Sequence, residues 1–255
     1  MERITRKPFQ GVGNIVRFNW HYYVIAFVFM MVLWWLKKSF PSNLNVLPEL
    51  FIYLTILSVI ISLSVSYYIY DRSNLYSFDW LKNLGIKEGQ QIVNINAGFD
   101  ETSSILSEKY PLSKIKALDF YDPIKHTEIS IERARKAYPA FAGTQTFSTN
   151  NIPLKKNSVD CIFLILSAHE IRNNEERIYF FKQLKNALHP AGKIVVVEHT
   201  RDIYNFMAYN LGFFHFLPKK TWRENFSEAQ LIEEAESKIT PFISVFTLHK
   251  NGTTS

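Results

Sequence analysis

The chain has 255 residues, of which 47% are apolar and 20% are charged, so it can bury a sizeable core and general disorder is excluded. It carries 29 Lys and Arg against 23 Asp and Glu, a formal net charge of +6, which favours an anionic membrane surface or a nucleic acid as partner. Its single cysteine, Cys161, excludes an internal disulfide framework and a cysteine-rich metal site.

Two long uncharged segments come first in the chain. Phe18–Leu36 and Leu50–Tyr70 contain no Lys, Arg, Asp or Glu. Each is long enough to cross the roughly 30 Å hydrocarbon core of a bilayer as a helix. For the first segment a signal peptide is the alternative, but no cleavage site of small residues follows it. The sequence therefore predicts a two-pass transmembrane hairpin, with residues 1–72 as a membrane anchor.

Basic residues flank the two segments more heavily than they occupy the loop between them. They are Arg3, Arg6, Lys7 and Arg17 before the first, Lys37 and Lys38 in the loop, and Arg72, Lys82 and Lys87 after the second. This asymmetry predicts a cytoplasmic location for both termini and for the domain that follows. Ser58, Ser62 and Ser66 form a small-residue ridge on which another helix can pack closely, and both the first span and a second copy of the chain, in a homodimer, remain open as its partner.

Residues 73–255 alternate short apolar runs with polar, helix-compatible segments, which is typical of a parallel sheet covered by helices. The predicted strands are Gln91–Ile95, Lys116–Phe120, Thr144–Phe147, Cys161–Leu166 and Lys193–Val197, with Phe242–His249 as a closing antiparallel strand. The predicted helices are Glu101–Lys109, Thr127–Ala137, Asn174–Leu188 and Glu224–Glu236. This order predicts a Rossmann-like, doubly wound α/β domain whose ligand site lies at the carboxyl ends of the strands.

The turn after the first predicted strand indicates which kind of ligand fits. Asp100 and Glu101 occupy the first turn of the next helix, where they suit the helix dipole but would repel a pyrophosphate. A cofactor without phosphates therefore fits better than a dinucleotide. Asp119 ends the second strand, where a carboxylate can accept both hydroxyls of a ribose, and Asp122 is the fallback for this role. For either residue, capping of the next helix is the alternative.

Residues Leu81–Lys250 resemble the class I S-adenosylmethionine-dependent methyltransferases, particularly the small-molecule branch that includes quinone-biosynthesis enzymes. The resemblance is carried by the turn Asn94–Asp100, by Asp119, and by the segments Phe147–Pro153, Asn157–Phe163 and Leu184–Lys193. It implies S-adenosylmethionine as the cofactor. The residues that it implies in cofactor binding are Asn94, Asn96, Gly98, Asp100, Asp119, Phe120, Ser148, Thr149 and Asn150.

The chain departs from that family in the cofactor turn. Asn94, Asn96, Gly98 and Asp100 stand where an acidic residue and three glycines are usual, and only one glycine remains. This loss keeps open a non-catalytic methyltransferase-like module that anchors or assembles a membrane biosynthetic complex. A nicotinamide oxidoreductase is a third interpretation, disfavoured because no Gly-x-Gly-x-x-Gly follows the first strand.

Methyl transfer to a hydroxyl requires a general base whose pKa is near neutral, and histidine is the side chain that suits this role. The preferred catalytic pair is His169 with Glu170 after the fourth strand, and His199 with Glu198 after the fifth is a second pair. The residues expected to contact the acceptor are Arg172, Arg201 and His215. No metal-ligand spacing such as His-Glu-x-x-His occurs, so no metal is expected.

The aromatic segment Tyr204–Leu217 follows the fifth strand, and Lys219, Lys220 and Arg223 come directly after it. This pattern is typical of a segment that lies against an anionic leaflet of a membrane. Packing of a helix in the core is the alternative. Together with the hairpin it predicts a lipophilic methyl acceptor drawn from the lipid bilayer, such as an aromatic lipid, a quinone precursor or a pigment. Nucleic acid is not expected. Residues 1–72 carry seven basic and three acidic side chains, +4, whereas residues 73–255 carry twenty-two and twenty, only +2.

Overall fold

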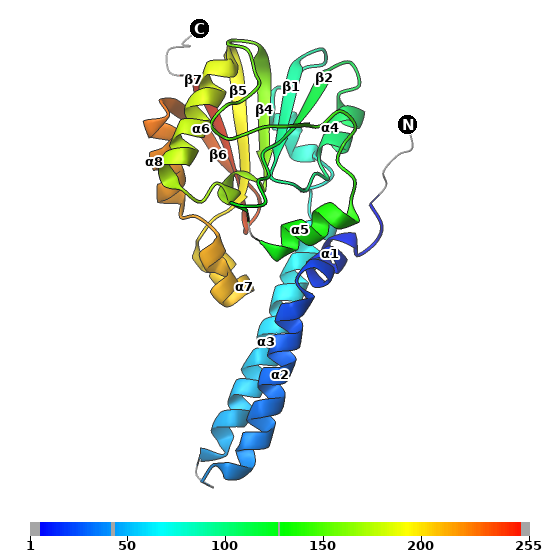
Figure 1. Cartoon of the computed structure of the whole chain (residues 1–255), viewed down its shortest axis with the longest axis vertical. Helices are drawn as coiled ribbons and strands as arrows, with labels where there is room; N and C mark the ends of the chain where they lie inside the picture. Colours follow the sequence, from blue (N-terminus) through cyan, green and yellow to red (C-terminus); the bar gives the residue numbers. More distant parts are fainter. Residues whose placement is uncertain (1–5, 42–43, 127, 251–255) are drawn as a thin grey trace.

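An α/β domain stands on a long helical hairpin in this protein (Figure 1). The computed structural model describes residues 6–41, 44–126 and 128–250. Arg3, which entered the charge asymmetry, and Thr127, the expected first residue of a helix, lie outside the described residues.

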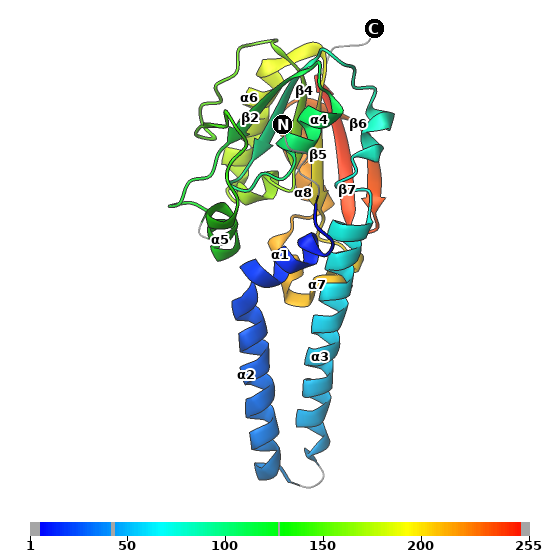
Figure 2. The same cartoon turned by 90° about the vertical axis from the view of Figure 1, so that its right-hand side faces the viewer.

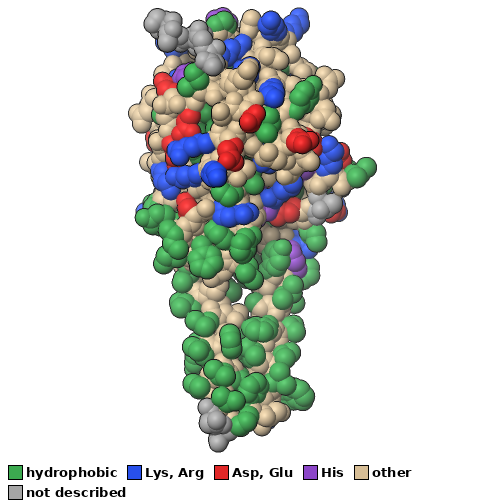
Figure 3. Space-filling model, turned by 90° about the vertical axis from the view of Figure 1, so that its left-hand side faces the viewer, with side chains coloured by type: hydrophobic (Ala, Val, Ile, Leu, Met, Phe, Trp, Pro, Cys, Tyr) green, Lys and Arg blue, Asp and Glu red, His purple; other side chains and the backbone are tan. Residues whose placement is uncertain are grey.

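The hairpin consists of α2 (Trp20–Leu36) and α3 (Val46–Tyr67), and α3 continues into a π-helical turn, η3 (Tyr68–Arg72). A short 3-10 turn, η1 (Lys37–Ser39), follows α2. In the most apolar window of each span, 0% of the residues are buried in Trp20–Ser39 and 6% in Val46–Arg72. Figure 3 shows apolar side chains covering this part of the surface. The two predicted helices are thus present, with a length and composition compatible with crossing a membrane, and their exposure distinguishes them from the buried helix of a soluble core.

A helix that the sequence did not predict, α1 (Gln10–Phe18), lies across the top of the hairpin (Figure 2). The Asp71 carboxylate at the end of η3 accepts hydrogen bonds from the backbone amides of Gly11 (2.7 Å) and Val12 (2.8 Å). It thereby satisfies two of the donors that a helix N-terminus leaves unpaired. A Cβ on Gly11 would lie 2.4 Å from the Cβ of Tyr70, so only glycine permits this close approach.

The sheet has seven strands in the order β3-β2-β1-β4-β5-β7-β6. The strands are β1 (Gln91–Asn96), β2 (Lys114–Asp119), β3 (Gln145–Thr146), β4 (Val159–Ile165), β5 (Leu188–His199), β6 (Leu231–Thr240) and β7 (Ile243–Lys250). The first five pair in parallel, and β7 pairs antiparallel with both β5 and β6. The strand order reverses between β1 and β4, which is where doubly wound sheets open a ligand site. The predicted Rossmann-like sheet and its closing antiparallel strand are therefore confirmed.

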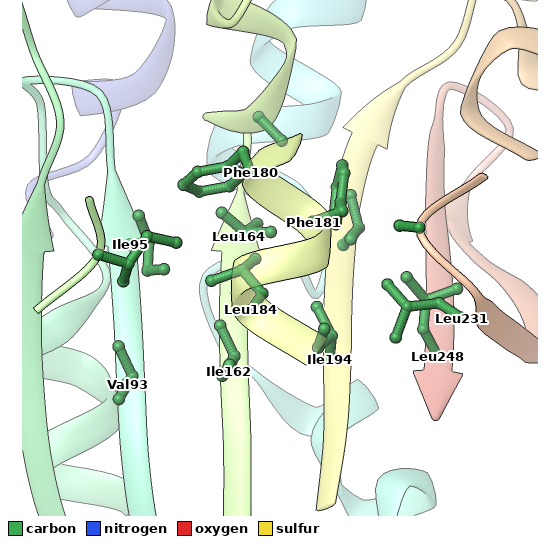
Figure 4. Close-up of a cluster of buried hydrophobic side chains, with 14 of the residues drawn as sticks. Val93, Ile95, Ile162, Leu164, Phe180, Phe181, Leu184, Ile194, Leu231 and Leu248 are labelled. Atoms are coloured by element: carbon green, nitrogen blue, oxygen red, sulfur yellow. The ribbon is translucent and has the colours of Figure 1, made fainter. Parts of the chain in front are cut away.

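Helices cover both faces of this sheet. The helical segments of the domain are η4 (Asp79–Leu84), α4 (Ser103–Lys109), α5 (Ile129–Ala137), η5 (Ala168–Glu170), α6 (Asn174–Ala187), α7 (Ile203–Tyr209), η6 (Asn210–His215) and α8 (Lys219–Glu228), of which α5 and α7 lie next to the hairpin. On one face Phe180, Phe181 and Leu184 of α6 pack on Ile162 and Leu164 of β4 (Figure 4). On the other face α4, η4 and η3 pack on the alternate residues of β4 and β5. The central strands are buried on both sides, as parallel strands usually are.

The prediction of a helix over Glu224–Glu236 is wrong in its second half. Helix α8 ends at Glu228, Gln230 adopts a left-handed conformation (φ 56°), and Leu231 begins edge strand β6. The acidic residues of this segment favour a helix locally, but antiparallel pairing with β7 along Leu231–Thr240, interrupted by two register shifts, overrides that preference.

The packing of α1 on Tyr70 can be tested with two neighbouring glycines. We expect Gly11→Ala to loosen α1 from the end of the hairpin, because the added Cβ meets the Tyr70 side chain and backbone. Gly13→Ala is the matched control, since nothing lies within 4 Å of its added Cβ, and it should stabilise α1 by about 0.5–1 kcal/mol. Amide hydrogen exchange of residues 10–18 in detergent is the measurement, and equal protection in the two variants would contradict the packing.

Candidate active site

A cavity of about 840 Å³ lies between the carboxyl end of the sheet and the top of the hairpin. Helices α1, α2 and α3 form one side, and the ends of β1, β4 and β5 with the η6 segment form the other. Residues that define its two sides are Phe18, Tyr22, Tyr23, Ser58 and Ser62 from the helices, and Ala97, His169, Glu170, His199 and His215 from the sheet side. The helical wall, with its aromatic rings, is the more apolar side, although Asn14, Asn19, Ser58 and Ser62 also line it; it faces a polar floor built on the strand ends.

The floor of the cavity holds a buried chain of charged groups centred on His169. Its Nδ1 lies 2.7 Å from Oε2 of Glu198, and its Nε2 lies 3.1 Å from Oε1 of Glu170. Burial alone would lower the pKa of His169, but the two carboxylates outweigh it and raise this pKa to about 10. Burial opposes ionisation of Glu170 as well, yet its contacts with His169 and His215 hold the pKa of its carboxyl far below the usual range. At neutral pH His169 is therefore a cation between two carboxylates, and it has to lose its proton before it can act as a base.

His215 joins this chain from the η6 segment. Its Nε2 lies 3.5 Å from Oε1 of Glu170, and its Nδ1 lies 3.5 Å from Oε1 of Glu128. Arg172 donates from Nη1 to the carbonyl of His215 (2.7 Å), and its Nη2 lies 2.5 Å from His215 Nδ1. Arg201 donates to the carbonyls of Phe216 (2.8 Å) and Phe214 (2.6 Å). Both arginines hold the backbone of the η6 segment, and direct contact with an acceptor stays a prediction for them.

His199 belongs to a different network from the one expected. Glu198 binds His169, so the alternative pair of Glu198 with His199 does not form: adjacent residues in a strand point to opposite faces. Instead, Nε2 of His199 lies 2.9 Å from the hydroxyl of Tyr70, and Nδ1 lies 2.9 Å from Oδ1 of Asn205. The ring stacks on Phe216 with centroids 4.6 Å apart. His199 thus connects strand β5 to the end of the hydrophobic hairpin.

Hydrogen bonds within the turn after β1 occupy most of its polar groups. Asp100 Oδ1 accepts from the amides of Thr102 and Ser103, both at 2.9 Å, and so caps α4. Asn94 donates to the hydroxyls of Thr102 and Ser103, both at 2.8 Å, while its buried Oδ1 has no hydrogen-bond partner in the part of the chain that the structure describes. Asn96 Oδ1 accepts from the amide of Gly98 at 3.0 Å. Gly98 has a φ of 101°, a conformation that favours glycine.

Asp119 is buried at the end of β2 as expected, but an arginine that the sequence did not single out lies against it. Its Oδ1 accepts from the amide of Tyr121 (2.9 Å), and its Oδ2 is 2.5 Å from Nη1 of Arg135 in α5. The Arg135 guanidinium also lies 3.3 Å from the carbonyl of Gly98 and over the ring of Tyr121. Arg135 therefore bridges the turn after β1 and the end of β2, and it lines a smaller pocket of about 520 Å³.

The remaining predicted cofactor residues lie away from the large cavity. The Phe120 side chain is buried in the core against Phe147 and Phe180. The Thr149 hydroxyl donates to Glu176, whereas Ser148 and Asn150 are exposed. None of the nine predicted cofactor residues, all of which the structure describes, lines the cavity of about 840 Å³; Asn94, Asn96, Gly98, Asp100 and Asp119 are absent from its lining as well.

The sequence patterns do not identify three residues of the site: Tyr70, Glu128 and Arg135. They also do not predict that Glu198 pairs with His169. Tyr70 ends an apolar run, where the pattern indicates only a transmembrane segment, and Arg135 lies in a polar helix among other charged residues. Because each meets its partner only through the fold, no local pattern could have identified it. His169, Glu170, His199 and His215, by contrast, all line the same cavity.

The sequence matches no model of a known protein family and no curated protein. Its fold is similar to that of a SAM-dependent methyltransferase from Aquifex aeolicus, at 18% identity over 70% of this chain and 93% of that one, with a TM-score of 0.50. It is also similar to a SAM-dependent methyltransferase from Methanosarcina mazei, at 12% identity over 68% of this chain and 97% of that one, with a TM-score of 0.52. The Rossmann-like fold of such proteins is thus shared by this chain.

The buried state of His199 predicts a loss of stability in acid. Burial lowers its pKa from 6.5 to about 4, so the folded chain keeps it neutral where the unfolded chain protonates it. The unfolded state then binds more protons, and stability falls as the pH drops from about 6.5 to about 4, by up to about 3 kcal/mol. We expect His199→Gln, which retains hydrogen-bonding groups, to have a flatter dependence of Tm on pH between about 6.5 and about 4.5. Parallel curves for the two proteins would show that His199 does not carry this effect.

Proposed function

We propose that the protein is a membrane-anchored methyltransferase that moves a methyl group from S-adenosylmethionine to a lipophilic small molecule. One observation carries this proposal: a single cavity is lined both by the strand ends of a methyltransferase-like fold and by two helices long and apolar enough to span a bilayer. A molecule dissolved in the bilayer could therefore reach the strand ends without crossing water. Aromatic lipids, quinone precursors and pigments have this chemistry.

The surface supports membrane insertion of the hairpin. Apolar side chains cover α2 and α3, whereas charged side chains of both signs lie where the hairpin meets the α/β domain (Figure 3). Burying the exposed side chains of the hairpin in lipid removes a large apolar surface from water. More basic residues flank the two helices on the side of the α/β domain than lie in the loop between them, so we place this domain and both termini in the cytoplasm.

The types of residue in the turn after β1 and at the end of β2 fit S-adenosylmethionine, but the Arg135 side chain stands in the way. The unpaired Oδ1 of Asn94 and the glycine conformation at Gly98 are features of a turn that approaches a ligand closely. Asp119 is a carboxylate at the strand end where ribose hydroxyls are accepted in such folds. Arg135 fills the space between these groups, and its guanidinium has to leave Asp119 when a ribose binds. The smaller pocket beside Arg135 would take the adenosine, and the large cavity the reacting end.

Bound there, S-adenosylmethionine supplies an electrophilic methyl group. The chain itself contributes positioning: the apolar wall holds the body of the acceptor, and the polar floor holds its nucleophilic atom. His169 remains our candidate for the group that takes the acceptor's proton, provided that it has first lost its own proton. Glu198 fixes the ring from behind, and Glu170 lies on the cavity side. Such a carboxylate orients an imidazole and stabilises its protonated form.

A second function, a non-catalytic module that assembles a membrane complex, is favoured by the ion pair between Arg135 and Asp119. In that case the arginine permanently takes the place of the ribose. Binding of the cofactor distinguishes the two functions.

Calorimetry with S-adenosylmethionine tests the cofactor site. We expect the full-length protein to bind it and Asp119→Ala to lose binding, because the ribose hydroxyls lose their acceptor. Arg135→Gln should bind up to about fivefold more tightly, since the partly exposed ion pair that the ribose displaces is worth about 1 kcal/mol at most. Binding by neither the wild type nor Arg135→Gln would leave the non-catalytic module as the function.

Access from the bilayer can be tested with a pair of serines on α3. Ser62 lines the cavity, whereas Ser64, two positions away, is exposed on the outside of the helix. The protein in lipid nanodiscs would receive a membrane lipid extract and S-adenosylmethionine with a deuterated methyl group, and mass spectrometry would locate the label. We expect labelled products in the organic phase with the wild type and Ser64→Trp, and at least about a tenfold loss with Ser62→Trp, whose indole blocks the cavity. Label only in water-soluble products would overturn the lipophilic acceptor.

A further inference from the structure

Three potential metal ligands converge on the floor of the cavity. They come from His169, Glu170 and His215, whose ligand atoms all lie within 4.8 Å of one another. His169 and Glu170 come from the turn after β4, whereas His215 comes from the η6 segment after α7. His169 and Glu170 are buried and His215 is partly buried, so their arrangement is fixed by the fold rather than by chance contact at the surface.

The spacing of these atoms suits a transition-metal ion. His169 Nε2 lies 3.1 Å from Glu170 Oε1, which lies 3.5 Å from His215 Nε2. Around a zinc ion with bond lengths of about 2.0–2.1 Å, ligand atoms in a tetrahedron are separated by about 3.3 Å. Two edges of such a tetrahedron are therefore already close to their required length. Two imidazoles and one carboxylate are also a ligand set that zinc and other first-row divalent ions accept.

Glu198 provides the outer support that a metal-binding histidine usually has. Its Oε2 lies 2.7 Å from Nδ1 of His169, and its Oε1 accepts from the His169 backbone amide at 3.2 Å. Glu198 is fully buried on β5. It therefore fixes the ring so that Nε2 faces Glu170 and the cavity, which is the carboxylate–histidine arrangement found behind many metal ligands.

The surroundings leave room for an ion with an open coordination position. All three ligand residues line the cavity of about 840 Å³, and so does Glu128, whose Oε1 lies 3.5 Å from His215 Nδ1. The opposing feature is the Arg172 guanidinium, which lies against the His215 ring. The Arg172 side chain is 43% exposed, so its guanidinium can turn toward solvent when a cation binds.

We propose that His169, Glu170 and His215 bind one divalent first-row transition-metal ion, with zinc as the best match, and that its fourth position opens into the cavity. The ion binds at Nε2 of His169 and neutralises the buried carboxylates of Glu170 and Glu198. With the ion bound, His169 is a ligand and is not available as a base. This site departs from the expectation of no metal, because His215 is far from the other ligands in the sequence and no motif joins them. If the fourth coordination position of the ion contacts an oxygen of the acceptor, that contact rests on the proposed function. Binding of the ion itself does not depend on the proposed function.

Metal titration of the full-length protein tests the site without cofactor or acceptor, so its result does not depend on methyl transfer. The protein is purified in detergent without a polyhistidine tag, treated with a chelator, and titrated with Zn²⁺ by calorimetry and with Co²⁺ by visible absorption. We expect one ion per chain and the intense visible bands of four-coordinate cobalt. Glu198→Gln should weaken binding by about 10- to 100-fold, because it keeps the ring in place but removes the charge behind it.

His215→Ala is the decisive variant, since His215 is the least buried ligand and its removal leaves the pairing of His169 with Glu198 intact. We expect a loss of at least about 100-fold in affinity, with far-UV circular dichroism unchanged. His249→Ala is the matched control, because His249 pairs with Glu234 on the far edge of the sheet (2.7 Å), and it should bind the ion like the wild type. Absence of stoichiometric binding, or equal binding by His215→Ala and the wild type, would overturn the proposal.

Discussion

The junction between the end of the hairpin and the edge of the sheet is the contact on which the rest of this structure depends. Within one π-helical turn, Ile69 is buried in the core of the α/β domain, Tyr70 meets His199 at 2.9 Å, and Asp71 caps α1. Three consecutive residues thus connect the hydrophobic hairpin to the core, to strand β5 and to the N-terminal helix. Because these contacts leave no flexible linker between the parts, the hairpin is held over the strand ends and the cavity between them has defined walls. A π-helical turn at this point is consistent with the frequent occurrence of such turns at functional sites.

Charge balance is the second constraint. Glu170 and Glu198 are both buried next to a cavity with an apolar wall, where an uncompensated carboxylate is costly. His169 lies between them and supplies one positive charge, while His215 and Arg172 lie on the outer side of Glu170. The arrangement requires a cation at its centre, and either a proton or a metal ion meets that requirement. Because the charges of Glu170 and Glu198 are balanced in this way, a polar floor can face the apolar wall of the cavity.

The buried carboxylate of Asp119 at the end of β2 follows the same principle of charge balance. Asp119 is nearly as buried as Glu198, and such a carboxylate needs a partner, which Arg135 supplies from α5. Helix α5 in turn contacts α1, and Ala134 of α5 lines the large cavity while its neighbour Arg135 lines the smaller pocket. The two pockets therefore adjoin at α5, and Glu128 just before this helix lines both of them. A movement of α1 or α5 would alter both pockets together.

Local patterns in the chain were sufficient to predict two uncharged helices, a parallel sheet built from alternating strands and helices, and histidines after the fourth and fifth strands. These features are local because hydrophobic periodicity and the ends of strands are encoded in neighbouring residues. They were insufficient for residues 231–236, where pairing with β7 outweighs the local preference for a helix. The partners of the buried charges also escaped prediction: Glu198 turns away from its neighbour His199 toward His169, and Arg135 reaches Asp119 from a separate helix. Only the tertiary structure decides such pairs, since a buried charge is stabilised by whichever opposite charge the fold brings within a few ångströms, and distance along the chain does not determine that choice.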